Sequence, residues 1–513
     1  MAKWSHGYNT DIPYTLGYYR ETTPEWMDFA LLISGFWPPE REPDRPLRYM
    51  DLGCGQGFGL CVTAALHPEM EFVGIDFNPT HIHHATTLAK EAGLTNVKFI
   101  EADFVELGAH WTEELGTFDY VVLHGIWSWI GPVVREGAVG ILRQAVRPGG
   151  VVYNSYNAQP GWHAGAILKE LLSLSVKAAS GDAQLEALRK GVSLANRLRE
   201  AGATVFRAYP GLMNRVEMLQ KHDLRYIANE YAHEALYIYW GHEVADEMYE
   251  AKLTLAATAT LPENFLPALL PDSLAKIVNE YTHPRMRNLL IDLIINQAFR
   301  RDLYQRGIVR ALKKPQLERL MATRVVGLRS GKKDFKFALS VGEVSGREEL
   351  YGPLQEMCDE GPVTIQEIIN RHPLKPTFAQ VVQAVAILIW DGRAAFASTA
   401  ESSQPAHSFN KAVVNAFNKG QIYQFLAAPA TNQGISVPPV EMLCCRALML
   451  NGAGAGKEEV TDLVVKNFEE LGLSIQKDGV AITDPDARRA EIAKDVENFF
   501  NEKLAVYSHL GII

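Results

Sequence analysis

The 513-residue chain has few cysteines and no pattern that would pair them or bind zinc. Its five cysteines are Cys54, Cys61, Cys358, Cys444 and Cys445, without a CxxC pair, and the last two are adjacent in the apolar stretch MLCCRALML. Disulfide frameworks and zinc sites use spaced sets of cysteines, often with paired histidines. We therefore expect reduced thiols in the protein core, no disulfide framework and no metal site.

Long hydrophobic runs are also absent. The longest uncharged apolar run, residues 120–134, is shorter than the ~20 residues that cross a bilayer, and it contains His124, Gly131 and Pro132. The N-terminal sequence MAKWSHGYNT has no apolar segment of the kind found in a secretory signal. These absences predict a cytoplasmic protein without a membrane partner.

Positive charge is not in excess. Lys and Arg total 50 against 60 Asp and Glu, which gives a formal net charge of -10, and no long block of one sign occurs. Phosphate-backbone binding normally requires a basic surface, so nucleic acid is disfavoured as the main partner. With 47% hydrophobic and 21% charged residues the composition is that of a folded protein, and its length allows roughly three or four domains.

Short β-rich runs alternate with helical stretches in the first third of the chain. The runs cover residues 47–52, 71–76, 97–103, 118–124 and 149–157. Runs separated by helices favour right-handed crossovers and a parallel sheet with helices on both faces. This predicts a doubly wound α/β domain, in which a ligand lies beyond the carboxyl ends of the strands.

The first run ends in the glycine turn DLGCGQGFG, which begins at Asp51. The turn has neither the GxGxxG fingerprint of nicotinamide cofactors nor the GxxxxGK[ST] pattern of a Walker loop. Its glycines let the backbone approach a ligand, because no Cβ atoms intervene, although Gly57 and Gly59 are equally consistent with helix packing.

Acidic residues also end the next two runs. Asp76 follows the second run, where a carboxylate can accept the hydroxyls of a ribose, and Asp103 with Phe104 follows the third, where they offer an acceptor and a ring to a base. Two alternatives stay open: Asp76 as a solvated strand-end carboxylate and Asp103 as a helix cap. Three carboxylates at successive strand ends suit a cofactor with free ribose hydroxyls and no phosphates.

Further motifs follow in a recognisable order. They are GYNTDIPY at 7–14, HGIWSW at 124–129, SYNAQPGWH at 155–163, RYIANEYAHEALYIYWGHEVADEM at 225–248 and LIINQAFRRDLYQR at 293–306. With them the sequence resembles the class I S-adenosylmethionine-dependent methyltransferases, and more narrowly the bacterial group that carries a methyltransferase regulatory domain. Part of that group methylates lysines of outer-membrane proteins. The resemblance covers most of residues 7–310.

The resemblance implies S-adenosyl-L-methionine as the cofactor and a Rossmann-like, seven-stranded methyltransferase sheet. The residues implied for the cofactor are Asp51, Gly53, Cys54 and Gly55 for the methionine part, Asp76 for the ribose, Phe77, Asp103 and Phe104 for the adenine, and His124 and Gly125 beside the sulfonium. Tyr14, together with Tyr8, is expected to fold over the cofactor as a lid. The neighbouring His81, His83 and His84 are expected on a solvated helix face, since no carboxylate completes a metal site with them.

Methyl transfer from a sulfonium is an in-line displacement, so the enzyme mainly holds a lone pair close to the methyl carbon. Aromatic residues after the fourth and fifth runs, among them Trp127 and Trp129, would lower the pKa of an incoming lysine amine and attract cations. His124 acts either as a base or as an orienting group. By resemblance, Tyr156 and Asn157 are candidates for orienting the attacking atom, with turn-backbone and packing roles as the alternative.

The methyl acceptor stays open at this point. A lysine, another protein side chain, a glycan and a small molecule all fit an aromatic pocket. A non-catalytic scaffold that retains the cofactor is the competing interpretation, and an oxidoreductase is a weaker one, because the GxGxxG fingerprint is missing.

The later chain is predicted to add modules to a methyltransferase domain over residues 1–310. Helical periodicity predicts an insertion at about 164–239 that roofs the site and pairs with a second subunit in a homodimer. A regulatory-type segment follows at about 220–305, with a sixth strand within 242–260 and a seventh within 299–307. Residues 361–398 have the helix, helix, helix, strand order of a winged-helix-like domain spanning 311–400, favoured for protein docking. Residues 401–513 are predicted to be mainly α-helical.

Overall fold

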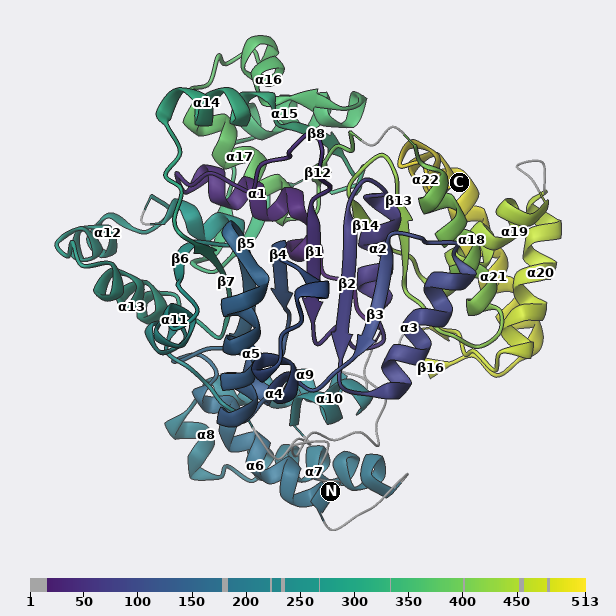
Figure 1. Ribbon diagram of the computed structural model, residues 1–513. Helices are drawn as coiled ribbons and strands as arrows, with labels where there is room; N and C mark the ends of the chain where they lie inside the picture. The colour runs from purple at the N-terminus through teal and green to yellow at the C-terminus, as the bar shows by residue number, and fades with distance from the viewer. Residues whose placement is uncertain are drawn as a thin grey trace.

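A mixed seven-stranded sheet is the centre of the computed structural model (Figure 1), with strand order β3-β2-β1-β4-β5-β7-β6. The structure describes residues 16–177, 183–221, 224–231, 236–266, 268–332, 334–399, 402–451, 456–477 and 480–513. The strands of the sheet are β1 (Arg48–Leu52), β2 (Glu71–Asp76), β3 (Val97–Glu101), β4 (Phe118–Leu123), β5 (Val146–Asn157), β6 (Leu253–Thr258) and β7 (Phe299–Arg306).

The five strands predicted from the first part of the sequence are all present and pair in parallel. The predicted sixth and seventh strands complete the sheet, and β7 runs antiparallel between β5 and β6. All six residues of β4 are buried, as expected for a central strand covered on both faces. The predicted Rossmann-like methyltransferase sheet is therefore confirmed.

Helices cover both faces of this sheet. One face packs against α1 (Pro24–Ile33), α2 (Phe58–Leu66) and α3 (Pro79–Glu91). The other face packs against α4 (Phe104–Ala109), α5 (Pro132–Ala145) and α11 (Gly241–Tyr249). Tyr49 faces the first core and its neighbour Met50 faces the second, because successive side chains of a strand point to opposite faces.

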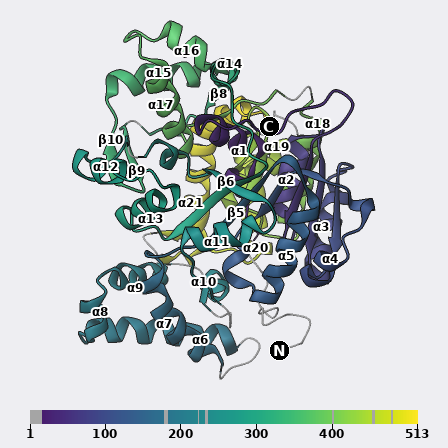
Figure 2. The same ribbon diagram turned by 60° about the vertical axis from the view of Figure 1, so that its left-hand side comes forward.

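Between β5 and α11 the chain forms the predicted helical insertion, which has a small core of its own. Its helices are α6 (His163–Lys177), α7 (Ala183–Glu200), α8 (Thr204–Ala208), α9 (Gly211–Lys221) and α10 (Leu224–Tyr231). Figures 1 and 2 both show helices α6–α8 at one end of the molecule, below the sheet and opposite α14–α17. The insertion therefore stands beyond the carboxyl end of β5.

A second accessory unit follows α12 (Asp272–Asn279), α13 (Pro284–Ile294) and β7. Its elements are α14 (Lys313–Ala322), β8 (Arg324–Gly327), β9 (Lys336–Leu339), β10 (Gly342–Ser345), α15 (Glu348–Glu360), β11 (Val363–Thr364), α16 (Ile365–Arg371), α17 (Phe378–Trp390) and β12 (Ala394–Phe396). The strands pair antiparallel in the order β11-β8-β12, and β9 pairs with β10. Within residues 361–398 there are two helices rather than the predicted three, because the short strand β11 occupies the start of that segment. A winged-helix domain stays a prediction.

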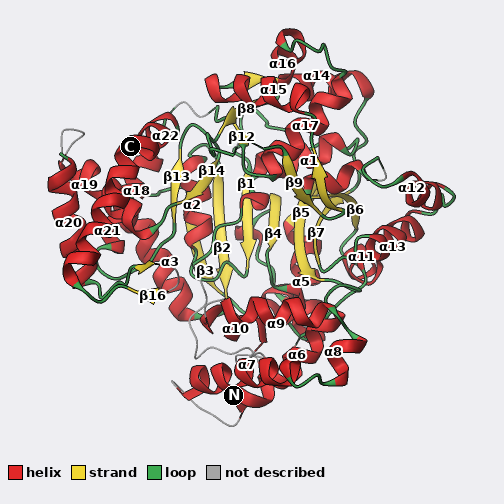
Figure 3. Cartoon of the chain, turned by 180° about the vertical axis from the view of Figure 1, so that it is seen from behind, coloured by secondary structure: helices red, strands yellow, loops and turns green. Residues whose placement is uncertain are grey.

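The last part of the chain is mainly α-helical, as predicted. Its elements are α18 (Gln404–Phe417), β13 (Phe425–Ala428), β14 (Gln433–Ser436), α19 (Pro439–Asn451), α20 (Lys457–Glu470), β15 (Gln476–Lys477), β16 (Val480–Ala481), α21 (Pro485–Asn498), the π-helical turn η6 (Phe499–Lys503) and α22 (Leu504–His509). Helix α18 and the β13-β14 hairpin pack against α2, the helix that follows the glycine turn (Figure 3). This C-terminal module therefore adjoins the sheet close to the predicted cofactor site.

The sequence predicts that membrane-spanning helices and disulfides are both absent. In the described ranges, no helix combines the length and the apolar character that spanning a membrane requires. The five cysteines are free thiols, and four of them are buried. Cys54 differs from the predicted core thiols, since it is partly exposed at the glycine turn.

Candidate active site

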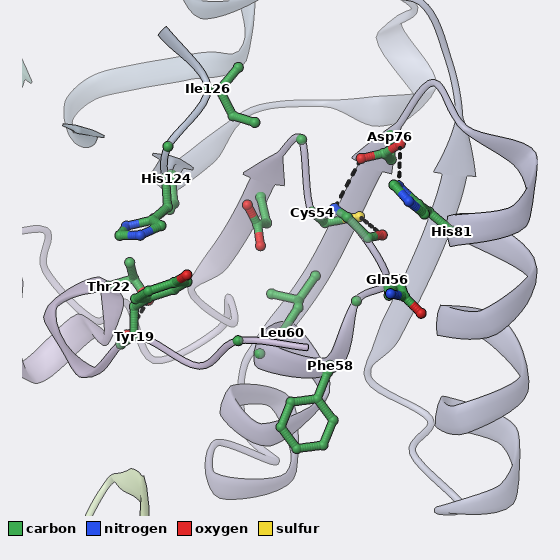
Figure 4. A pocket seen from close by; sticks show the side chains of 18 of the residues that line it. Tyr19, Thr22, Cys54, Gln56, Phe58, Leu60, Asp76, His81, His124 and Ile126 are labelled. Atoms are coloured by element: carbon green, nitrogen blue, oxygen red, sulfur yellow. Dashed lines mark hydrogen bonds and ion pairs between the residues drawn. The ribbon is translucent and has the colours of Figure 1, made fainter. Parts of the chain in front are cut away.

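A pocket opens at the carboxyl ends of the central strands (Figure 4), where a doubly wound sheet places its ligands. The residues of the glycine turn line its floor. Other lining residues are Tyr18, Tyr19, Thr22, Asp51, Asp76, Phe77, His81, Asp103, Phe104, His124, Gly125, Ile126 and Trp129. Every described residue predicted for the cofactor is in this lining: Asp51, Gly53, Cys54, Gly55, Asp76, Phe77, Asp103, Phe104, His124 and Gly125. Tyr14 lies outside the described residues.

The glycine turn is held by its own backbone. The amides of Gly53 and Cys54 both donate to the carbonyl of Ile75, over 2.8 and 3.1 Å. Gly53 has a φ of +82°, which favours glycine, and a Cβ there would stand 2.4 Å from the Ile126 side chain. Gly57 has a φ of +71°, and its Cβ would meet Ala85 of α3 at 2.4 Å. The turn thus needs glycine both for backbone conformation and for close helix packing.

Asp76 is fixed by hydrogen bonds rather than solvated. Asp76 is buried, with 5% of the residue exposed. Oδ2 accepts a 3.0 Å hydrogen bond from the amide of Gly55, and Oδ1 accepts from the amide of Asn78 at 2.9 Å and lies 3.2 Å from His81 Nδ1. A carboxylate offers about four acceptor positions, so Oδ2 retains capacity for a ligand hydroxyl. The solvated alternative considered for Asp76 is therefore not what the structure shows.

Asp103 caps helix α4, as one of the two sequence interpretations held. Its Oδ1 accepts from the amides of Val105 at 2.7 Å and Glu106 at 3.4 Å, which satisfies donors at the start of the helix. The same residue lines the pocket beside Phe77 and Phe104. Capping fixes the carboxylate in place, so the cap and a contact with a ligand are compatible.

The electrostatics of the pocket suit a positively charged ligand without phosphates. Burial, and then the charge of Asp76, raise the pKa of Asp51 to about 7. Burial likewise raises the pKa of the Cys54 thiol. No Lys or Arg is among the described residues that line the pocket. Two carboxylates whose basic neighbour in the lining is a histidine, His81 beside Asp76, favour a cation such as an ammonium or sulfonium. The residues present therefore fit S-adenosylmethionine.

His124 forms the opposite side of the pocket (Figure 4), across the glycine turn from Asp76 and His81. Its ring stacks on Tyr19 with centroids 3.6 Å apart, and its Nδ1 lies 3.0 Å from the hydroxyl oxygen of Tyr153. Burial, helped by the positive charge of Arg301, lowers the pKa of His124 to about 3. The imidazole is therefore neutral at neutral pH and a weak base.

Three residues predicted for the acceptor side do not line the pocket. The Tyr156 hydroxyl donates a 2.6 Å hydrogen bond to Asp302, and Trp127 Nε1 donates to Glu247 at 2.8 Å. Both side chains are fully buried. Asn157 is 4% exposed, and its backbone amide donates to Ser128 Oγ. These three residues could therefore influence an acceptor only indirectly, by positioning strand β5 and the turn after β4.

The histidines of α3 are not the solvated set that the sequence predicted. His81 lines the pocket, and His84 is hydrogen-bonded at both ring nitrogens, to the carbonyl of Gln56 and the hydroxyl of Tyr423. Only His83 is exposed. Nothing in the local sequence indicates these contacts, because one partner of His84 is 339 residues away.

Three further lining residues were not predicted from the sequence, whereas Trp129 belongs to the aromatic residues expected after the fourth run. Tyr18, Tyr19 and Thr22 reach the pocket from the segment before α1, and Trp129 reaches it from the 3-10 turn η4 (Trp127–Trp129). The motif HGIWSW predicts both Trp127 and Trp129 near the site, and the turn directs Trp127 into the core and leaves Trp129 on the pocket. A helical turn separates two such neighbours onto different faces, which the motif alone does not reveal.

Comparisons with known proteins agree with this geometry. A family model described as a methyltransferase domain matches residues 43–181, and one described as a predicted methyltransferase regulatory domain matches residues 216–306. An uncharacterized protein of Synechocystis sp. is 32% identical over 518 residues, which cover 99% of each chain. A tRNA (guanine-N(7)-)-methyltransferase of Rubrobacter xylanophilus is 43% identical over 76 residues, or 15% of this chain and 34% of that protein.

Among solved structures, PKMT2 from Rickettsia typhi in complex with AdoHcy shares the fold over almost the whole chain. The TM-score is 0.70 at 18% sequence identity, covering 97% of this chain and 99% of that one. The likeness therefore extends beyond the sheet to the accessory and C-terminal parts.

Proposed function

Because the chain belongs to the S-adenosylmethionine-dependent methyltransferases that carry a methyltransferase regulatory domain, we propose that its acceptor is a protein side chain, specifically a lysine amine. The observation that carries the proposal is the aromatic end of the pocket, where the neutral His124 stacks on Tyr19. PKMT2, which shares the fold, is a protein lysine methyltransferase, and this likeness supports the same acceptor class.

The cofactor supplies a methyl group activated by a sulfonium. We assign the methionine part to Asp51, Gly53, Cys54 and Gly55, the ribose to Asp76, the adenine to Phe77, Asp103 and Phe104, and the sulfonium side to His124 and Gly125. The amide of Gly125 donates to Ser155 Oγ over 2.9 Å, which ties the end of β4 to β5. These residues would hold the donor so that an acceptor lone pair could approach its methyl carbon in line with the leaving sulfur.

A lysine must lose its proton before it attacks. Aromatic rings around the entrance disfavour the ammonium by keeping water away, while their faces still attract the cation on its way in. His124 is too weak a base to take the proton efficiently at neutral pH, since its pKa is about 3. Of the two roles that the sequence left open, we therefore assign it the orienting one, with the proton leaving to solvent.

Tyr19 lines the pocket and is 38% exposed, so we assign the acceptor's entrance to this ring. A long side chain of a macromolecule can reach the site from solvent past this ring, whereas the body of the acceptor stays outside. This geometry favours a flexible amine such as lysine over a rigid, bulky acceptor.

The remaining chain is assigned accessory roles within the same proposal. Residues 1–310 form the catalytic domain of a cytoplasmic enzyme, residues 311–400 a protein-docking unit and residues 401–513 a C-terminal module. The helical insertion exposes large apolar side chains at Leu174, Leu194, Leu198, Met213 and Met218. Such side chains are typical of an interface, so we assign the insertion to a homodimer contact. Sedimentation of the wild type against a Leu174→Glu, Met218→Glu variant tests this, because a monomeric wild type would contradict it.

The acceptor is tested with a methyl-labelled donor. The purified protein is incubated with labelled S-adenosylmethionine and a bacterial lysate, after which protein is separated from small molecules and hydrolysed. We expect the label in methylated lysine. The control is the same lysate after its lysines have been acetylated, and proteins of this control lysate should accept no label.

Two results would contradict the lysine assignment. One is label in another amino acid, and the other is label in the glycan or small-molecule fraction. Asp76→Asn serves as the control for cofactor dependence, because at a cofactor concentration below the wild-type Kd the variant should give several-fold less label in every fraction.

A further inference from the structure

The C-terminal module touches the cofactor site through Tyr423, a buried residue between α18 and β13. Its ring stacks on Phe58, the first residue of α2 and part of the pocket lining, with centroids 4.7 Å apart and an interplanar angle of 11°. Phe409 of α18 also packs on Phe58, with ring centroids 6.0 Å apart. The start of α2 is thus enclosed by rings that lie more than 300 residues away in the sequence.

The Tyr423 hydroxyl also begins a chain of hydrogen bonds to the glycine turn. Its oxygen lies 2.9 Å from His84 Nε2, and His84 Nδ1 lies 2.7 Å from the carbonyl oxygen of Gln56. A carbonyl only accepts, so Nδ1 carries the proton and donates. Burial lowers the pKa of His84, which keeps the ring neutral. Nε2 is then the acceptor, and the Tyr423 hydroxyl donates to it.

This series of hydrogen bonds fixes the orientation of one peptide group of the glycine turn, the one between Gln56 and Gly57. The carbonyl and amide of a trans peptide point in opposite directions. On one side the carbonyl of Gln56 accepts from His84, and on the other the amide of Gly57 donates to the carbonyl of Cys54 at 3.0 Å. The orientation of this peptide determines where Gly55 and the first turn of α2 lie against a ligand.

A second contact reaches the same pocket. Tyr18, which lines the pocket, packs on Phe425 of β13 with ring centroids 5.7 Å apart. A Cβ at Gly434 of β14 would stand 3.1 Å from Tyr18 and from Val62 of α2, so the hairpin approaches both closely. The C-terminal module therefore supports the pocket from two independent points.

We propose that the C-terminal module sets the affinity for the cofactor, with Tyr423 as a positioning residue that holds the Gln56–Gly57 peptide through His84. Tyr423 acts through the glycine turn and does not touch the cofactor. The inference concerns donor binding alone, so it stands or falls independently of which acceptor is methylated.

The test measures the Kd of S-adenosylmethionine and of S-adenosylhomocysteine by calorimetry on the full-length chain. Tyr423→Phe removes the hydroxyl and keeps the stacked ring. Loss of one hydrogen bond that orders the turn should weaken both ligands about two- to tenfold. His84→Asn keeps an N–H near the position of Nδ1 but has no atom at Nε2. In the His84→Asn variant, an added Tyr423→Phe substitution should change neither Kd further, because the hydrogen bond between residues 423 and 84 is already lost.

The matched control is Tyr507→Phe. This tyrosine is equally buried in the same module and donates its hydroxyl to Glu441, away from the glycine turn. The control should lower the melting temperature with an unchanged Kd. The proposal is overturned if Tyr423→Phe also lowers only the melting temperature, or if its effect on Kd is the same with and without His84.

Discussion

The imidazole of His124 stacks on the ring of Tyr19, with centroids 3.6 Å apart and an interplanar angle of 26°. His124 directly follows β4, whereas Tyr19 belongs to the segment before α1, so this stack joins two separate parts of the pocket wall. The stack shields the imidazole from water, and this burial is the main reason why its pKa is depressed to about 3.

The pH dependence of stability tests that depressed pKa. An unfolded chain protonates His124 below about pH 6.5, whereas the folded protein does so only near pH 3. The stabilising contribution is therefore complete above pH 6.5 and decreases as the pH falls, by at most about 1.4 kcal/mol per pH unit. Melting curves at pH 8 to 5 should show a smaller loss for His124→Asn than for the wild type. Parallel curves for the two proteins would contradict the assignment.

Asp76→Asn should weaken cofactor binding about tenfold or more. The substitution removes the charge that strengthens a hydrogen bond to a ligand hydroxyl, a contribution of ~1.5 to 3 kcal/mol. Calorimetric titration with S-adenosylmethionine measures the effect. Asp119→Asn is the matched control, since this carboxylate lies near the other end of β4 and binds Arg45. The Asp119→Asn variant should have a lower free energy of unfolding and an unchanged affinity for S-adenosylmethionine. Equal affinities for Asp76→Asn and the wild type would remove the ribose assignment.

Gly53→Ala should damage cofactor binding more than its backbone strain explains. Gly53 and Gly149 have similar positive φ values of +82° and +79°, so alanine costs both positions ~1 to 2 kcal/mol. Only at Gly53 does the new Cβ meet a neighbour, the Ile126 side chain on the pocket wall, whereas nothing lies within 4 Å at Gly149. We expect both variants to melt earlier and Gly53→Ala alone to lose affinity. Similar affinities in the two variants would show that the wall tolerates the displacement.

Tyr156→Phe separates a structural from a catalytic role. The Tyr156 hydroxyl donates to the buried Asp302, which also pairs with Arg300. Removing this hydrogen bond to a charged group should lower the free energy of unfolding by ~1.5 to 3 kcal/mol and leave kcat near the wild-type value. Chemical denaturation and steady-state kinetics measure the two quantities. A fall of ~10² in kcat with unchanged stability would instead support the role that the sequence suggested.

Local sequence determined the part of the site that lies at strand ends. Asp51 and Asp76 lie in the last residues of β1 and β2, Asp103 follows β3, and the carboxyl ends of neighbouring parallel strands meet at one edge of the sheet. The alternation of strands and helices in the sequence was therefore enough to predict that these carboxylates and the glycine turn lie close together. The helix cap formed by Asp103, which also lines the pocket, could likewise be predicted from the local sequence.

Tertiary structure decided everything that depends on contacts between distant segments. Tyr156 and Ser155 are neighbours on β5, yet register with β7 directs Tyr156 to Asp302 while Ser155 supports Gly125 at the pocket. Side chains of a strand alternate between faces, and a motif does not state which face meets the ligand. Likewise, Tyr423 reaches His84 across 339 residues, because packing of the C-terminal module on α2, and not any local propensity, determines that contact.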